Sequence, residues 1–159
     1  MNTARVVGSL IPSGQTTFYI LGVNFFLYLA MMLFNAQNGN GRSVMDLDFT
    51  TLFLFGAKEP SRIFSQGEWW RLVTAGFLHA SVIHILMNSW GLYDLGAQVE
   101  EVFGSGRYIV IYLVSSMFGF FVSSLWSSSL SVGASAGIFG LIGAMISFMS
   151  FSLEVLVRR

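Results

Sequence analysis

The residue with the clearest chemical potential is a serine between two glycines. Ser135 lies between Gly133 and Gly137 at the start of an apolar run. A serine at a helix N-terminus is a favoured cap, because its oxygen accepts a bond from an otherwise unpaired backbone N–H. The same place suits a nucleophile, because free N–H groups and the helix dipole stabilise a developing oxyanion. The pattern G-x-S-x-G is short and also arises by chance, so it leaves both interpretations open.

Two histidines and an asparagine lie upstream within one apolar run, at His79, His84 and Asn88. A polar group in hydrocarbon costs on the order of a few kcal/mol unless it has a partner, so such residues indicate a functional site. At about 100° per residue, His84 and Asn88 share a helix face, whereas His79 points about 140° away from His84. A helical zinc pair needs histidines four residues apart, and this chain has no cysteine to complete a tetrahedron. We therefore expect neither a metal ion nor another cofactor.

The composition indicates a membrane protein that crosses the bilayer several times. The chain has 159 residues, of which 54% are hydrophobic and 10% charged, and its mean hydropathy is +0.68. Four apolar runs each approach the roughly 20 residues that a helix needs to cross hydrocarbon, and an unpaired strand is excluded there. We predict an all-α bundle of about four transmembrane helices. The tail is 1–17, the membrane domain 18–159, and the helices are about 18–36, 72–95, 108–126 and 132–153.

The stretch 37–71 is predicted to be an interfacial loop, because it combines loop-forming residues with an apolar segment and ends in the aromatic-belt sequence Trp69-Trp70-Arg71. The basic residues divide four and four between the two sides, so the positive-inside rule does not fix the orientation. The Arg158-Arg159 pair beside a helix end favours both termini in the cytoplasm, and we expect a plasma (inner) membrane protein. A net charge of zero without a basic cluster gives no reason to expect nucleic acid as a partner.

The alternating direction of the predicted helices relates Ser135 to the polar residues of the second helix. If the second and fourth helices run in the same direction, His84, Asn88 and Ser135 all lie in the first halves of helices that begin at one membrane face. Asn88 lies roughly 13 Å below His79 along its helix, at about 1.5 Å per residue. We therefore expect one water-filled pocket that these side chains share, below the outer surface.

Taken in order, these motifs resemble the rhomboid intramembrane serine proteases. The matching elements are Trp70-Arg71, the H-x4-H-x3-N pattern of His79, His84 and Asn88, the turn Gly104-Ser105-Gly106, and Gly133-Ala134-Ser135-Ala136-Gly137. The resemblance covers about residues 69 to 149. It implies a membrane-embedded serine endopeptidase that cuts transmembrane segments of other proteins near the lipid interface. Its partners would be those substrates and the bilayer.

The resemblance also implies roles for single residues. Ser135 would be the nucleophile, and His84 and Asn88 would help its backbone N–H to hold the oxyanion. The flanking Gly133 and Gly137 would let a substrate or another backbone approach closely.

Four further positions would support the site from outside it. His79 would lie close to the catalytic residues, and Trp70 and Arg71 would hold the first loop against the membrane. Phe139 matches an aromatic position that packs against the catalytic histidine of the family.

A serine hydroxyl needs a general base to become a nucleophile, and here the resemblance is incomplete. The family takes this base from a histidine on a sixth helix, whereas this sequence ends after its fourth apolar run and its two histidines match other positions. We expect a chain that is truncated at the C-terminus and has no general base of its own. The small face of the fourth helix would then await a partner helix or self-association; its residues are Gly133, Gly137, Gly140 and Ala144.

Three interpretations stay open. The chain is the N-terminal portion of a protease, a non-catalytic rhomboid relative that binds membrane segments without cutting them, or an unrelated four-helix protein such as a transporter subunit. The scarcity of charge in the apolar runs and the matched motif spacing oppose the third. A subordinate hypothesis makes His84 the base for Ser135.

Overall fold

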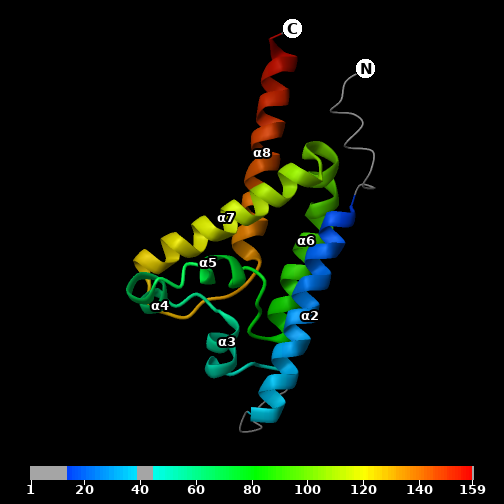
Figure 1. Ribbon diagram of the computed structural model, residues 1–159. Helices are drawn as coiled ribbons and strands as arrows, with labels where there is room; N and C mark the ends of the chain where they lie inside the picture. The colour runs from blue at the N-terminus through cyan, green and yellow to red at the C-terminus, as the bar shows by residue number, and fades with distance from the viewer. Residues whose placement is uncertain (1–13, 39–44, 159) are drawn as a thin grey trace.

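The computed structural model describes residues 14–38 and 45–158, and these residues form helices and connecting segments without a named strand (Figure 1). Helix α2 descends to the end of the molecule that holds the short helices, α6 returns from it, and α8 points back in the direction of α6. We call the part made by residues 45–81 and 127–134 the loop end. The helices are α2 (Gln15–Asn38), α3 (Phe49–Phe55), α4 (Pro60–Gln66), α5 (Arg71–Thr74), α6 (Val82–Phe103), α7 (Ser105–Trp126) and α8 (Ser135–Val157).

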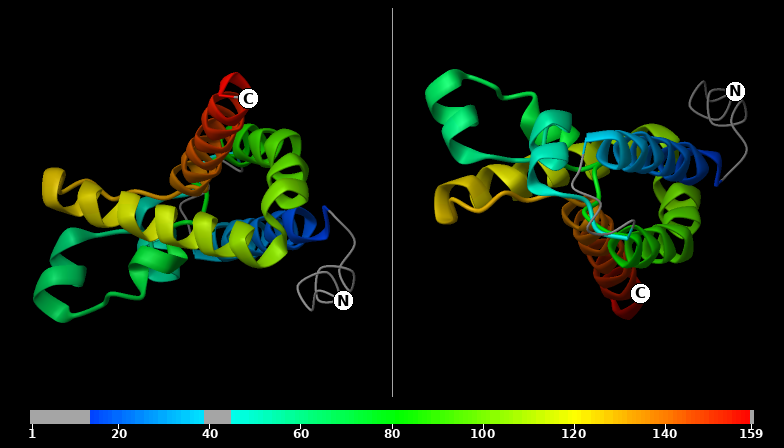
Figure 2. Two further views of the ribbon diagram at one scale, coloured as in Figure 1. Left: turned by 90° about the horizontal axis from the view of Figure 1, so that it is seen from above. Right: turned by 90° about the horizontal axis from the view of Figure 1, so that it is seen from below.

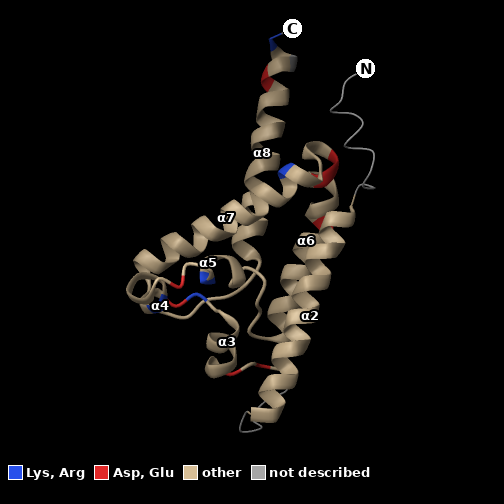
Figure 3. Ribbon diagram, in the orientation of Figure 1, with Lys and Arg blue, Asp and Glu red and all other residues tan. Residues whose placement is uncertain are grey.

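Three of the described helices are long and apolar enough to cross a membrane: α2, α7 and the part of α8 from Ser135 to Val155. Helix α6 is equally long but more polar, because its second half contains Asp94, Glu100 and Glu101. It packs against α2, α7 and α8. Most of the charged residues that the structure describes lie near helix ends or in the loop end (Figure 3), and Asp94 within α6 is the exception. The predicted all-α membrane fold is confirmed, with three clear candidate spans and α6 packed among them.

The second predicted helix is placed differently by the structure. A continuous helix over 72–95 was expected, but α5 ends at Thr74, residues 75–81 are not helical, and α6 begins at Val82 and continues to Phe103. The physical reason is a cap: Ser81 has extended backbone, and its Oγ accepts a hydrogen bond from the His84 backbone N at 3.2 Å. Hydropathy does not register such a cap, because the apolar run continues through it.

The other predicted boundaries differ by a few residues. Helix α2 begins at Gln15, inside the predicted tail, and the predicted loop contains α3 and α4. Residues 1–13 of the tail, 39–44 of the loop and the terminal Arg159 lie outside the described residues.

The small face of α8 is occupied, contrary to the prediction that it awaits a partner. A Cβ on Gly137 would lie 2.5 Å from the Tyr112 ring, and one on Gly140 would overlap Ser115, both on α7. Gly133 meets His84 of α6 instead. The reason is that α7 packs along α8, and Figure 2 shows α7 between α8 on one side and the short helices α4 and α5 on the other. Small residues allow this close approach of two helices, and here it serves packing within the chain.

A buried carboxylate connects three helices at the end of the bundle opposite the loop end. Glu100, near the end of α6, is 3% exposed. It accepts hydrogen bonds of 2.6 Å from the hydroxyls of Thr16 and Ser105, and one of 3.2 Å from the Thr16 backbone N. One side chain therefore connects the start of α2, the end of α6 and the start of α7.

Candidate active site

Ser135 is the first residue of α8, and its side chain is exposed. Ala134 occupies the N-cap position without a side-chain bond. Within the described part of the chain, the Ser135 hydroxyl has no hydrogen-bond partner, so it does not act as a cap. The first bond across the start of α8 runs from Ile138 N to Ala134 O at 3.0 Å. The backbone N–H groups of residues 135 to 137 therefore have no acceptor within the helix and can receive an anion.

Gly133 brings α6 to the segment that carries this serine. Its φ is 127°, and its backbone N donates to Ala75 O at 2.9 Å. A Cβ at this position would lie 2.6 Å from His84 Nε2 and 2.8 Å from His84 Cε1. The imidazole of His84 therefore packs directly on the backbone two residues before Ser135. Only glycine combines this φ with this close contact.

Asn88 lies one turn further along α6 and is 8% exposed. Its Nδ2 donates to the backbone oxygen of His84 at 2.9 Å, so its amide is engaged with its own helix. The second N–H of Nδ2 stays available to donate to a substrate. One turn further along, α6 and α8 pack against each other at Gly91. A Cβ added to Gly91 would lie 3.8 Å from the side chain of Ile138.

His79 precedes α6 and is completely buried. Its ring meets the ring of His84 edge-on, with 5.1 Å between the centroids. Neither ring nitrogen of His79 has a hydrogen-bond partner among the described residues. The contact makes His79 a buried neighbour of the His84 ring.

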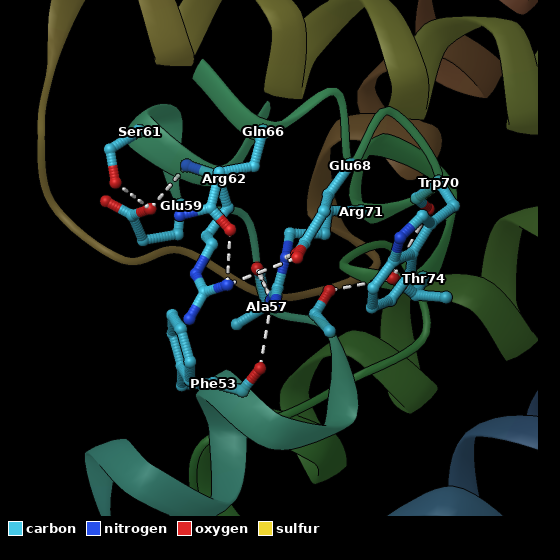
Figure 4. Close-up of polar contacts among 11 residues, drawn as sticks. Phe53, Ala57, Glu59, Ser61, Arg62, Gln66, Glu68, Trp70, Arg71 and Thr74 are labelled. Carbon is cyan, nitrogen blue, oxygen red and sulfur yellow. Dashed lines mark hydrogen bonds and ion pairs between the residues drawn. The ribbon is translucent and has the colours of Figure 1, made fainter. Parts of the chain in front are cut away.

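Arg71 organises the loop end from within (Figure 4). Its side chain is 5% exposed and donates to Phe53 O and Ala57 O, each at 2.9 Å, and to the Glu68 carboxylate. The guanidinium also lies 4.8 Å from the ring centroids of Phe53 and Trp70. Trp70 itself is 48% exposed, as an interfacial aromatic residue would be.

Phe139 is 72% exposed. It lies one turn after Ser135 on the face of α8 that no described helix covers. Within residues 14–38 and 45–158, there is no group of three His, Cys, Asp or Glu side chains that could hold a metal ion. The chemistry available at Ser135 is therefore that of a free hydroxyl, backbone amides and the side chains of α6.

Comparison with known proteins gives the family. The model of the Rhomboid domain matches residues 66–157, which contain Arg71, both histidines, Asn88 and Ser135. The chain belongs to the rhomboid family. It is a multi-pass membrane protein homologous to rhomboid serine proteases.

The rhomboid relatives are longer proteins. Rhomboid protease GluP of Bacillus subtilis (strain 168) is 39% identical over 142 residues, which are 89% of this chain and 26% of that protein. RHOMBOID-like protein 6, mitochondrial, of Arabidopsis thaliana is 41% identical over 99 residues, or 62% of this chain and 32% of the relative. The chain thus spans about a quarter to a third of the length of these relatives.

No motif in the sequence of this rhomboid chain marks Lys58. This residue is the only lysine in the sequence and is completely buried beside the connection from α7 to α8. It could have been singled out because it is the one lysine beside seven arginines. Its burial then points to bound partners, since a lysine is almost never fully buried without them.

Proposed function

We propose that this chain carries the nucleophile and the oxyanion site of an intramembrane serine endopeptidase that cleaves membrane-spanning segments of other proteins. The observation that carries the proposal is the contact between His84 and Gly133, because it sets the imidazole of α6 beside the backbone that leads to an unpartnered serine hydroxyl. The membership of the family, which includes proteases, supports it.

In this mechanism the Ser135 oxygen bonds to the carbonyl carbon of the scissile peptide, and its proton passes to a base. The carbonyl oxygen becomes an oxyanion, which the free amides at the start of α8 stabilise together with the His84 side chain. The C–N bond then breaks, the base returns the proton to the leaving amine, and water hydrolyses the acyl-enzyme. Asn88 would join the oxyanion donors through the second N–H of Nδ2, since the first donates to His84 O.

The proposed mechanism also needs a general base for Ser135. The sequence has two histidines; His84 packs on Gly133 and is proposed as an oxyanion donor, and His79 is buried against the His84 ring. We propose that a base from outside this sequence approaches the exposed side of Ser135 and Phe139. We also propose that the loop end faces the outside of a plasma membrane, with both chain ends in the cytoplasm.

A non-catalytic protein that binds membrane segments is the second candidate. The observation that favours it is the exposed apolar side of α8, where Phe139, Ile146 and Phe151 are each more than half exposed. Such a protein would use the exposed apolar side of α8 for binding and would leave Ser135 unreactive.

Labelling with a fluorophosphonate probe in detergent micelles distinguishes these functions. With imidazole added in place of the external base, the protease predicts a covalent adduct on Ser135 that Ser135→Ala abolishes, whereas a serine that stays unreactive would favour the binding protein. His84→Gln keeps a side-chain donor, whereas His84→Ala does not. An oxyanion role predicts that Gln retains much more labelling than Ala, whereas a base role predicts that both lose it. His79→Ala should label more than His84→Ala, because in this proposal His79 only supports the His84 ring.

A further inference from the structure

Lys58 lies in the interior, where burial of a charge is energetically unfavourable. The residue is 0% exposed, and no carboxylate forms an ion pair with it within the described part of the chain. Burial lowers the pKa of the Lys58 ammonium, and the nearby Glu59 carboxylate opposes this effect. A side chain that served packing alone would be apolar, because replacement of a buried charge by an apolar group is often neutral or stabilising.

The hydrogen bonds of Lys58 among the described residues run to the connection between α7 and α8. Its Nζ donates to Ser127 O at 3.0 Å and to Ser129 O at 2.9 Å. Ser127 is the C-cap of α7, so the ammonium lies at the negative end of that helix dipole, where a cation is favoured. The backbone of Lys58 also exchanges two hydrogen bonds with Ser131, of 3.0 and 3.1 Å.

The same connection leads directly to the nucleophile. Two residues after Ser131, Gly133 N donates to Ala75 O, and two residues later α8 begins at Ser135. On the other side, the carbonyl of Ala57, which precedes Lys58, accepts a bond from Arg71 at 2.9 Å. Lys58 therefore joins the Arg71 network to the backbone that enters α8.

We propose that Lys58 is a positioning residue: its ammonium holds segment 127–133 against the loop end and thereby fixes the placement of Ser135. This proposal rests on the proposed function of Ser135 for its catalytic meaning. Its structural part, the order of segment 127–135, does not depend on catalysis and can be measured separately.

The first test uses the parent chain. Because Lys58 is the only lysine, protein labelled with 15Nζ-lysine has one side-chain ammonium signal in heteronuclear NMR. We expect slow exchange with water and a titration midpoint below that of free lysine. A signal that exchanges and titrates like free lysine would overturn the proposal, and this measurement does not require any variant to fold.

The second test compares hydrogen–deuterium exchange in Lys58→Met, Lys58→Arg and a control, Arg62→Met. Met keeps the length of the side chain without its donors, Arg retains donors, and Arg62 is a partly exposed neighbour outside these contacts. We expect Lys58→Met to accelerate exchange of the amides of Ser131 and Gly133 at least ~10-fold, because bonds to charged groups are lost. Protection in α2 and α6 should not change, and Lys58→Arg should recover part of the effect. Unchanged exchange at 131–133, or an equal rise throughout the chain, would contradict the proposal.

The third test is the rate of fluorophosphonate labelling. A nucleophile displaced by about 1 Å loses on the order of 100-fold in rate, so Lys58→Met should label ~10- to 100-fold more slowly than Arg62→Met, with partial rescue by Lys58→Arg. Equal rates would overturn the link to Ser135. If the parent chain is not labelled, the proposed function fails for this chain, while the exchange experiment still decides whether Lys58 orders the segment.

Discussion

Replacement of Gly133 by alanine tests the geometry of the candidate site most directly. The backbone φ of 127° is one that residues with a side chain rarely adopt, and holding it costs on the order of 1–3 kcal/mol. The new Cβ would also lie 2.6 Å from His84 Nε2, and such overpacking adds about 1–3 kcal/mol. We expect Gly133→Ala to lower the free energy of unfolding in detergent micelles by about 2–6 kcal/mol.

A double variant separates the two contributions. His84→Ala removes the ring that the new Cβ would meet but leaves the backbone strain. In the cycle of Gly133→Ala and His84→Ala, the two effects should therefore be less than additive by about 1–3 kcal/mol. Denaturant titration followed by tryptophan fluorescence measures all four chains.

Gly143→Ala is the matched control, because a Cβ at Gly143 on α8 meets nothing within 4 Å. Alanine is the better helix former, so this change should leave stability unchanged or raise it by up to about 1 kcal/mol. The contact between His84 and Gly133 would be refuted if Gly133→Ala were as harmless as Gly143→Ala, or if the double variant lost the full sum of the two single effects.

Three other predictions concern the elements that hold the site. Glu100→Gln should lower the free energy of unfolding by about 1.5–3 kcal/mol, since it weakens charge-assisted bonds from three donors, whereas Gln at the exposed Glu101 should have little effect in the same titration. Arg71→Lys should accelerate proteolysis within 45–70 several-fold, because a lysine cannot reproduce the planar set of donors; equal cleavage rates would contradict it. The Thr51 backbone N–H lowers the pKa of the Asp48 carboxyl, so amide protection of α3 should be full above the ordinary Asp pKa and be lost as the pH falls through the lowered one, and Asp48→Asn should remove this pH dependence.

The membrane helices could be predicted from the sequence because lipid permits few backbone structures. An apolar run of sufficient length must be helical in hydrocarbon, and this reasoning located α2, α7 and α8. The faces within α6 could also be predicted, since His84 and Asn88 are four residues apart. That these residues perform the proposed chemistry stays a prediction.

Two features depended on information that hydropathy does not contain. The cap at Ser81 divides an apolar run that reads as continuous. The chain there is held by the segment 45–47, since Leu47 N donates to Ala80 O and Val82 N donates to Met45 O. The occupied face of α8 was also missed, because glycine spacing shows that a helix can approach but not which one. Tyr112 and Ser115 of α7 fill that face.

The bonds between Lys58 and the entry to α8 join residues that are 69 and 71 positions apart in the chain. Contacts of such long sequence separation form late, since the loop that they close must first be ordered. Helices α6 and α7 can pair as neighbours during insertion, but the backbone that presents Ser135 acquires its final shape only when the segment that precedes both of them has folded back. We therefore expect Ser135 to become reactive as one of the last events of maturation.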